Sequence, residues 1–117
     1  MLKEVHDPQR FGVPVFENSR IVRIEEKPKN PQSKYAVIGI YLYDGTVFDR
    51  IRALKPSARN EYEITDINNS YIAEGTLKHA FLDGWWTDAG TFESLWHASN
   101  MVREKASRNG AIAAEAD

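Results

Sequence analysis

Residues 35–43 form a nine-residue run that is apolar almost throughout, and this run restricts the folds open to the chain. The run is rich in β-branched and aromatic side chains, which is typical of a strand that other structure covers on both faces. Gly39, inside the run, indicates that a ligand or another backbone approaches the strand closely. The run therefore predicts a strand buried within a layered structure.

Three other segments have strand-like composition. Segments 11–17 and 21–26 are separated by turn residues and predict a β-hairpin. Pro14 lacks a backbone N–H group, so we expect it on an edge strand or at a bulge. Two prolines place a loop at 27–33, and segment 76–82 predicts a further strand.

Three helices are predicted in the second half of the chain. The first begins after a cap at Asp44 and ends before Pro56. The second carries apolar residues at helical spacing and ends at Gly75. The third begins after a cap at Thr91. The residues expected on the shared face of the first helix are Val47, Phe48, Ile51 and Leu54, and those on the buried stripe of the third are Phe92, Leu95, Trp96, Val102 and Ala106.

The order of these elements is strand, strand, strand, helix, helix, strand, helix. This order predicts an α/β or α+β layer structure with a mixed sheet. The length of 117 residues supports about one domain. We expect that single domain to span residues 1–109 and a flexible tail to follow at 110–117.

Composition excludes several classes of function. A formal net charge of −2 gives no broad positive surface, so neither nucleic acid nor a membrane is an expected partner. The absence of cysteine excludes disulfides, cysteine-based zinc sites and a thiol nucleophile. No apolar run approaches the ~20 residues of a membrane span, and the first residues do not resemble a signal peptide. We therefore expect a cytoplasmic protein.

The segment Glu25-Glu26-Lys27-Pro28 lies where a strand gives way to a loop that proline stiffens. A carboxylate at such a point can accept hydrogen bonds from sugar hydroxyls, and a lysine can meet a phosphate as a point charge. The alternative is an ordinary solvated hairpin end. Arg59, on a polar loop, is either a second phosphate contact or an exposed arginine without a ligand.

Asp88 directly precedes the Ala-Gly-Thr start of the third helix and follows two tryptophans. Its carboxylate suits a hard cation, and an indole face suits a sugar ring. Alternatively, Asp88 bonds local backbone donors and the tryptophans are core residues. Neither of the two common glycine-rich phosphate motifs, G-x-G-x-x-G and G-x-x-x-x-G-K-[ST], occurs in the chain.

Six segments together resemble the sugar-1-phosphate nucleotidylyltransferases, especially the glucose-1-phosphate thymidylyltransferases. They are Arg-Phe-Gly-Val at 10–13, Ile-Glu-Glu-Lys-Pro-Lys-Asn-Pro at 24–31, Tyr-Ala-Val-Ile-Gly-Ile-Tyr at 35–41, Leu-Lys-Pro-Ser-Ala-Arg at 54–59, Glu-Ile-Thr-Asp at 63–66 and Trp-Thr-Asp-Ala-Gly-Thr at 86–91. The resemblance implies the C-terminal, sugar-phosphate-binding part of a Rossmann-like nucleotidyltransferase fold.

The resemblance also implies a role for individual residues. The backbone of Gly12 would meet the sugar, Glu26 would grip its hydroxyls, and Lys27 and Arg59 would contact its phosphate. The other implied positions are Val37, Gly39 and Tyr41, which would line the sugar pocket, Trp86, which would border it, and Asp88, which would be the second aspartate of a Mg²⁺ site.

Two features of the family are missing from these residues. They are a glycine-rich G-G-x-G-T-R-L segment on the nucleotide-binding half and another Mg²⁺-binding aspartate, so only half of the metal site is expected. Members of the family make nucleotide sugars when a sugar-1-phosphate oxygen attacks the α-phosphate of a nucleoside triphosphate and releases pyrophosphate. That chemistry depends on holding both reactants in line.

We therefore expect the chain alone to bind a sugar 1-phosphate resembling glucose 1-phosphate, or to self-associate, without catalysing nucleotidyl transfer. A homodimer or higher homo-oligomer is expected because exposed strand edges and apolar faces pair readily. The alternative is that the chain is the C-terminal subunit of a split glucose-1-phosphate thymidylyltransferase, and that a separate N-terminal half supplies the missing residues.

Overall fold

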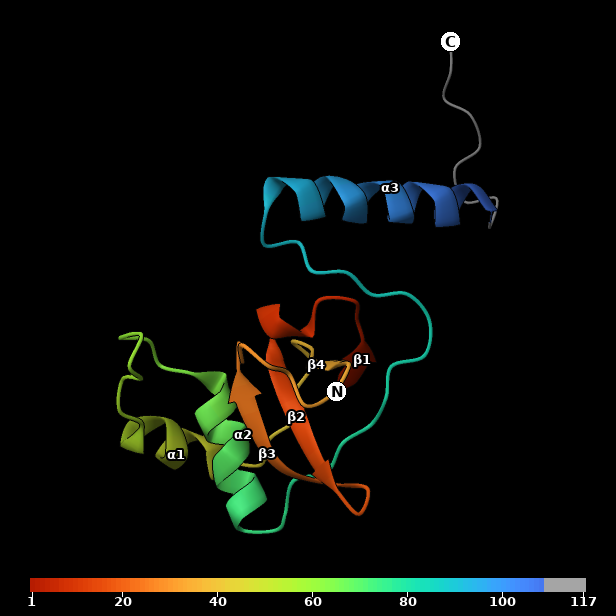
Figure 1. The fold of residues 1–117 in the computed structure, drawn as a ribbon. Helices are drawn as coiled ribbons and strands as arrows, with labels where there is room; N and C mark the ends of the chain where they lie inside the picture. The colour runs from red at the N-terminus through yellow and green to blue at the C-terminus, as the bar shows by residue number, and fades with distance from the viewer. Residues whose placement is uncertain (109–117) are drawn as a thin grey trace. The chain divides into compact units, whose positions relative to one another are not determined.

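The computed structural model describes residues 1–108 and divides the chain into two compact units, Met1–Asp83 and Gly84–Asp117 (Figure 1). The elements of the first unit are β1 (Leu2–Glu4), the 3-10 turn η1 (Pro8–Arg10), β2 (Gly12–Glu17), β3 (Arg20–Glu26), β4 (Tyr35–Val37), α1 (Val47–Ala53) and α2 (Ile64–Ala73). The second unit contains α3 (Phe92–Arg108). Within residues 1–108, no helix is long and apolar enough to cross a membrane.

The four strands form one sheet in the order β1-β4-β2-β3. All three pairings between neighbouring strands are antiparallel. The expected mixed sheet is therefore wrong for the described residues, in which the parallel contact is an isolated bridge between Leu2 and Phe81. Helix α2 packs along β3 (Figure 1), and α1 packs on α2.

The predicted hairpin is confirmed by β2 and β3. Its central turn residues, Asn18 and Ser19, have φ angles of 48° and 64°, as a two-residue type I′ turn requires. Pro14 lies on an interior strand, so the expected edge position is wrong, although the register shifts one residue later, between Val15 and Phe16. The backbone N–H and carbonyl of its cross-strand partner, Ile24, form hydrogen bonds with the side chain of Asn69 on α2. The missing N–H of Pro14 therefore costs this pair no hydrogen bond between the strands.

The run at 35–43 is a strand only as far as Val37. The antiparallel partner β1 pairs with β4 only from Leu2 to Glu4, and one further bond joins the Ile38 N–H to the Met1 carbonyl. Beyond that point exposure rises from 1% at Ile38 to 93% at Leu42. The prediction of a covered strand through residue 43 is therefore wrong, because within residues 1–108 no neighbouring strand continues beside it.

The strand expected at 76–82 is also wrong. The segment is joined to Leu2 by a single bridge and two backbone hydrogen bonds, from the Leu2 N–H to the Ala80 carbonyl and from the Leu82 N–H to the Leu2 carbonyl. These contacts are too few to establish a ladder, so the segment remains an extended connection.

Helices α1 and α2 form within the predicted ranges. Helix α1 begins one residue after Thr46, whose N–H and hydroxyl both donate to Asp44 Oδ1, so Asp44 organises the turn before the helix. Helix α2 ends before Gly75, whose φ of 71° is the left-handed conformation that glycine supplies at low cost. On the expected apolar face of α1, Val47 is buried, while Phe48 and Ile51 are exposed.

A small core joins these helices. It consists of Val47, Ile67 and Tyr71, with Tyr43, Leu54 and Leu77 packed against it. The core therefore holds α1 and α2 together.

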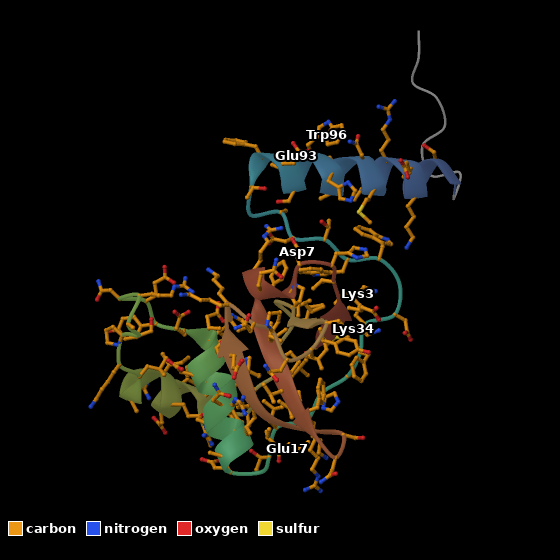
Figure 2. All side chains as sticks on the ribbon, in the orientation of Figure 1. Lys3, Asp7, Glu17, Lys34, Glu93 and Trp96 are labelled. Atoms are coloured by element: carbon orange, nitrogen blue, oxygen red, sulfur yellow. The ribbon has the colours of Figure 1, made fainter. Side chains whose placement is uncertain are left out.

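Helix α3 begins with the predicted cap. The Ser94 N–H donates to Thr91 Oγ1 at 3.1 Å, and the Thr91 N–H donates to Ser94 Oγ at 3.0 Å. The predicted buried stripe is wrong, because Phe92 and Val102 are exposed. Trp96 is exposed as well (Figure 2). Within the second unit, α3 is the only helix or strand among the described residues, so no element of that unit covers the stripe. The tail expected at 110–117 lies outside the described residues.

Candidate functional site

Three of the predicted site residues lie in one row across the sheet. In the strand register, Gly12 is opposite Glu26 on one side and opposite Val37 on the other. The antiparallel order β4-β2-β3 produces this row, since it brings the start of β2 beside the ends of both neighbours. The glycine thus lies between a residue that carries a carboxylate and an apolar residue.

The carboxylate of Glu26 is bonded to the first turn of α2. Thr65 Oγ1 donates to Glu26 Oε2 at 2.5 Å, and Thr65 is only 5% exposed. One turn later, Asn69 bonds both backbone groups of Ile24. Four helix residues advance about 6 Å and two strand residues about 6.6 Å. The spacing therefore lets one face of α2 bond alternate residues of β3.

Gly12 is required beside this bond for steric reasons. A Cβ atom at Gly12 would lie 3.2 Å from Thr65 Oγ1, 3.3 Å from Glu26 Oε2 and 3.3 Å from Ile24 Cγ2. Real Cβ atoms rarely approach other atoms so closely, so a side chain here would push against the Thr65–Glu26 pair. The absence of a side chain at Gly12 therefore leaves room for the Glu26 carboxylate.

Arg59 lies among three carboxylates. Its Nη2 bonds Glu61 Oε2 at 2.5 Å, while its Nη1 lies 3.7 Å from Glu26 Oε1 and 3.8 Å from Glu63 Oε1. Ser57 Oγ donates to Glu63 Oε1 at 3.0 Å and so orients that carboxylate. The structure therefore brings Arg59 beside Glu26, two residues that lie 33 positions apart in the sequence.

Lys27 continues directly from β3 with a φ of 45°, an uncommon conformation for a residue other than glycine. Its backbone N–H donates to the Phe11 carbonyl at 3.0 Å, and this bond holds the turn. The side chain of Lys27 is exposed. Lys27 therefore supplies a solvated charge next to Glu26.

The predicted pocket residues after β4 have different surroundings. The ring of Tyr41 stacks on that of Tyr43 at 5.8 Å. Burial, with a smaller contribution from the negative charge of Glu26, raises the pKa of Tyr41. At Gly39, a Cβ atom would meet nothing within 4 Å, so the expected close approach of another backbone is wrong for the described residues. This position is open space.

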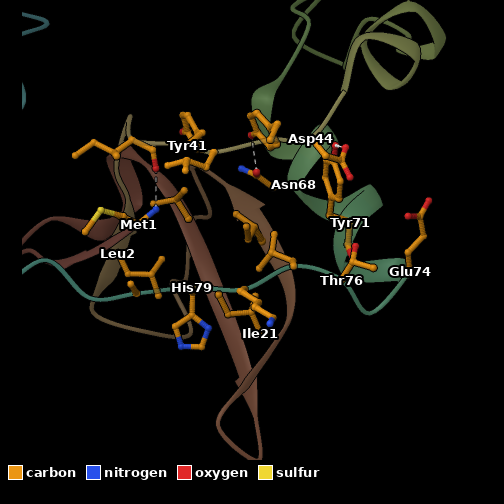
Figure 3. A pocket seen from close by; sticks show the side chains of 18 of the residues that line it. Met1, Leu2, Ile21, Tyr41, Asp44, Asn68, Tyr71, Glu74, Thr76 and His79 are labelled. Atoms are coloured by element: carbon orange, nitrogen blue, oxygen red, sulfur yellow. Dashed lines mark hydrogen bonds between the residues drawn. The ribbon is translucent and has the colours of Figure 1, made fainter. Parts of the chain in front are cut away.

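A cavity of about 590 Å³ is lined in part by Tyr41 (Figure 3). Val37 and Tyr41 line it, whereas Gly12, Glu26, Lys27 and Arg59 do not. Its further lining includes Tyr43, Asp44, Arg50, Asn68, Tyr71 and Glu74. Two of the predicted site residues therefore face this cavity, and the carboxylate–arginine cluster is separate from it.

Arg50, Glu74 and Asp44, which line the cavity, already have bonding partners. Arg50 bonds Glu74 at 2.5 Å and Ser70 at 2.9 Å, and its guanidinium lies 3.9 Å above the ring of Tyr71. The bond from Arg50 lowers the pKa of Glu74, and bonds from Thr46 and Tyr71 lower the pKa of Asp44. These pairings connect α1 to α2.

Trp86 and Asp88 belong to the second unit. The Gly90 N–H donates to Asp88 Oδ2 at 3.1 Å, which is the local turn that the alternative interpretation of Asp88 predicted. Within residues 1–108 no three potential metal-ligating residues come together. Mg²⁺ is commonly held by one or two carboxylates plus substrate phosphates, so Asp88 fits such an ion as one ligand of several.

Sequence reasoning missed three members of the cluster. Glu61 and Glu63 were given no role, although alternating carboxylates next to Arg59 are a visible charge pattern. Thr65 lies within the segment 63–66, but the sequence alone does not indicate its function. Its partner Glu26 is 39 residues away, and no local periodicity connects the two.

Comparisons with known proteins agree with one another. A family model described as nucleotidyl transferase matches residues 1–105. The glucose-1-phosphate thymidylyltransferases of Mycolicibacterium smegmatis and Neisseria meningitidis are each 48% identical to the chain, over 109 and 103 residues. These matches cover 91% and 86% of this chain but only 38% and 36% of the relatives. The chain thus spans less than two fifths of their length.

A solved structure extends the likeness to the fold. A Bacillus anthracis protein, described as a glucose-1-phosphate thymidylyltransferase and solved in complex with sucrose, matches with a TM-score of 0.79 and 58% identity. The match covers 87% of this chain and 42% of that one. Since the family model matches most of the 117 residues, the chain belongs to the nucleotidyl transferase family and is similar to its glucose-1-phosphate thymidylyltransferases.

Proposed function

We propose that the first unit binds the sugar-1-phosphate substrate of a glucose-1-phosphate thymidylyltransferase-like protein. The observation that carries the proposal is the position of Arg59 Nη1, 3.7 Å from Glu26 Oε1, at the end of the row that contains Gly12. A carboxylate that can accept hydrogen bonds from sugar hydroxyls thus lies beside a guanidinium that can donate hydrogen bonds to a phosphate. A sugar phosphate requires both.

Each member of the cluster has a distinct part in this proposal. Glu26 accepts hydrogen bonds from sugar hydroxyls. Arg59 binds the phosphate through its planar fork of donors, and Lys27 adds a flexible point charge. Val37 and Tyr41 supply apolar and aromatic walls.

The reaction named for the relatives needs more than this cluster. A thymidylyltransferase must hold a nucleoside triphosphate in line with the sugar phosphate, and none of the 117 residues forms a glycine-rich phosphate motif. Asp88 would be one ligand of Mg²⁺, an ion that neutralises phosphate charge when bound. We therefore propose that these residues bind the sugar phosphate without catalysing the transfer by themselves.

The alternative is that the chain works as one part of an enzyme whose other part supplies the nucleotide site. The observation that favours it is the coverage, since the matches span only 36–38% of the two curated relatives. Mixing the chain with a polypeptide that corresponds to the remaining residues of such a relative should restore pyrophosphate release. Failure of the two polypeptides to associate would overturn this alternative.

A titration tests the binding proposal. Glucose 1-phosphate added to the ¹⁵N-labelled chain should give saturable NMR shifts at the start of β2 and the end of β3. Glu26→Gln should weaken glucose 1-phosphate binding while leaving the affinity for inorganic phosphate unchanged or raising it, because the sugar contact is lost and the phosphate contact remains. The matched control is Asp49→Asn, which changes a residue of α1 outside the cluster. Absence of saturable shifts in the wild-type chain at millimolar ligand would overturn the proposal.

We also propose that α3 pairs with α3 of a second copy. An antiparallel pair centred on Ser99 places Phe92 of one copy opposite Ala106 of the other, a large side chain against a small one. The same register places Glu93 opposite Lys105, so the charges are complementary. The exposed stripe of α3 supports this arrangement. The cytoplasm remains the predicted location of the protein.

A further inference from the structure

Glu26 and Arg59 lie close together but do not form a close ion pair. The distance from Arg59 Nη1 to Glu26 Oε1 is 3.7 Å, longer than a hydrogen bond, although both side chains are partly exposed. The other carboxylate oxygen, Oε2, accepts the Thr65 hydroxyl at 2.5 Å. The hydroxyl therefore holds the carboxylate toward α2 and away from the guanidinium.

This separation matters for the function proposed above, on which the inference rests. Arg59 already bonds Glu61. If Glu26 also bonded Arg59 directly, it would further neutralise the charge that the phosphate needs and would occupy the oxygen that a sugar hydroxyl needs. The terminal torsion of a glutamate side chain is broad and weakly restricted, so the carboxylate turns toward the strongest donor available. Thr65 is the donor that competes with Arg59.

We propose that Thr65 is a positioning residue: its hydroxyl keeps Glu26 apart from Arg59, so that Glu26 accepts sugar hydroxyls while Arg59 binds the phosphate. Thr65 does not itself touch the sugar phosphate. It acts through Oε2 of Glu26 and leaves Oε1 as the acceptor of the sugar hydroxyl.

Two features fix the Thr65 hydroxyl in place. Thr65 is buried in the first turn of α2, and Asn69, one turn later, bonds both backbone groups of Ile24. The bare backbone of Gly12 closes the other side, since a Cβ there would lie 3.2 Å from Thr65 Oγ1 and 3.3 Å from Glu26 Oε2. The hydroxyl and the carboxylate therefore have little freedom to separate.

Two substitutions of similar size isolate the hydroxyl. Thr65→Val removes it and keeps the branched shape, whereas Thr65→Ser keeps it. Thr76→Val is the matched control, because Thr76 Oγ1 donates to the Tyr71 carbonyl past the other end of α2, away from Glu26. Thermal unfolding of each variant establishes that it is folded before binding is measured.

The first measurement uses no ligand. In Thr65→Val the Glu26 carboxylate should turn onto Arg59, so the NMR signals of the Arg59 guanidinium should shift, whereas Thr65→Ser and Thr76→Val should resemble the wild type. An unchanged Arg59 signal in folded Thr65→Val overturns the positioning role. This result does not depend on whether the chain binds sugar phosphate.

The second measurement compares glucose 1-phosphate with inorganic phosphate by calorimetry. Thr65→Val should lose about tenfold in glucose 1-phosphate affinity, as expected when one bond to a charged group is removed, and Thr65→Ser should restore most of it. If the wild type binds and Thr65→Val binds equally well, the positioning role is wrong. If the wild type itself does not bind, the proposed function is wrong, while the ligand-free signal of Arg59 still decides the position of Glu26.

Discussion

Asn69 makes both hydrogen bonds that a neighbouring strand would offer to Ile24. The Ile24 N–H donates to Asn69 Oδ1 at 2.8 Å, and Asn69 Nδ2 donates to the Ile24 carbonyl at 2.9 Å. Ile24 lies on β3, the last strand of the sheet. A side chain of α2 thus replaces strand pairing at this point and covers backbone groups that would otherwise invite pairing with another chain.

We expect Asn69→Ala to lower the free energy of unfolding by about 2 kcal/mol, since two part-buried bonds are lost and each contributes about 1 kcal/mol. Denaturant unfolding followed by circular dichroism measures the change. Asn30→Ala, in the exposed loop after β3, should leave the unfolding free energy within about 0.5 kcal/mol of the wild type. Equal losses in the two variants would contradict the role of Asn69.

The features that could be predicted from the sequence are those that nearby residues determine. The turn at Asn18 and Ser19, the cap at Thr91 and the end of α2 before Gly75 each depend on the conformation of a few consecutive residues. A type I′ turn or a helix cap has the same chemistry in any fold. Local signals therefore placed these elements within one or two residues.

The features that were predicted wrongly or missed depend on a partner residue that is distant in the sequence. A run of apolar residues predicts that something covers it but not what, and for Leu42 and Phe92 no described residue of their own unit does so. The cluster at Glu26 shows the same limit. Glu26 and Arg59 were predicted as site residues, but Thr65, which orients the carboxylate, was missed because only the packing of α2 on β3 brings it there.

Tyr43 should make stability depend on alkaline pH. Its hydroxyl donates to Asn68 Oδ1 at 2.7 Å, and burial is the main cause that raises its pKa to about 12. The unfolded chain loses this proton near pH 10. The stabilisation is therefore fully present below about pH 10 and is lost as the pH rises from about 10 to about 12.

Denaturant unfolding of the wild type and Tyr43→Phe across this pH range measures the effect. The wild type should be the more stable of the two below pH 10, and its advantage should shrink toward pH 12. Tyr62→Phe, which changes an exposed tyrosine, should keep the pH dependence of the wild type. An advantage of the wild type over Tyr43→Phe that stays constant through pH 12 would refute the prediction.

The exposed stripe of α3 predicts self-association. Light scattering should give the wild type a mass of at least two chains at micromolar concentration, and Trp96→Glu should give the mass of one, because a charge is costly inside an apolar helix pair. Phe48→Glu, which changes an equally exposed ring on α1, should leave the mass unchanged. A wild type that scatters as one chain at every concentration would rule out pairing through α3.

Glu61 should compete with phosphate for Arg59. It forms the shortest contact of the guanidinium, 2.5 Å, while more than half of its side chain is exposed. Phosphate binding at Arg59 therefore requires that this pair open. Exposed ion pairs contribute up to about 1 kcal/mol, so Glu61→Gln should tighten binding of inorganic phosphate and of glucose 1-phosphate by up to about fivefold.

Asp49→Asn separates this local effect from the change in net charge. It removes one carboxylate from another exposed pair, in which Arg52 Nη1 bonds Asp49 Oδ1 at 2.7 Å, and it alters the net charge of the chain equally. Calorimetric titration of both variants should show tighter binding for Glu61→Gln alone. Equal gains would mean that long-range charge and not release of Arg59 governs the affinity, and in that case the gains should disappear at high salt, where such interactions are screened.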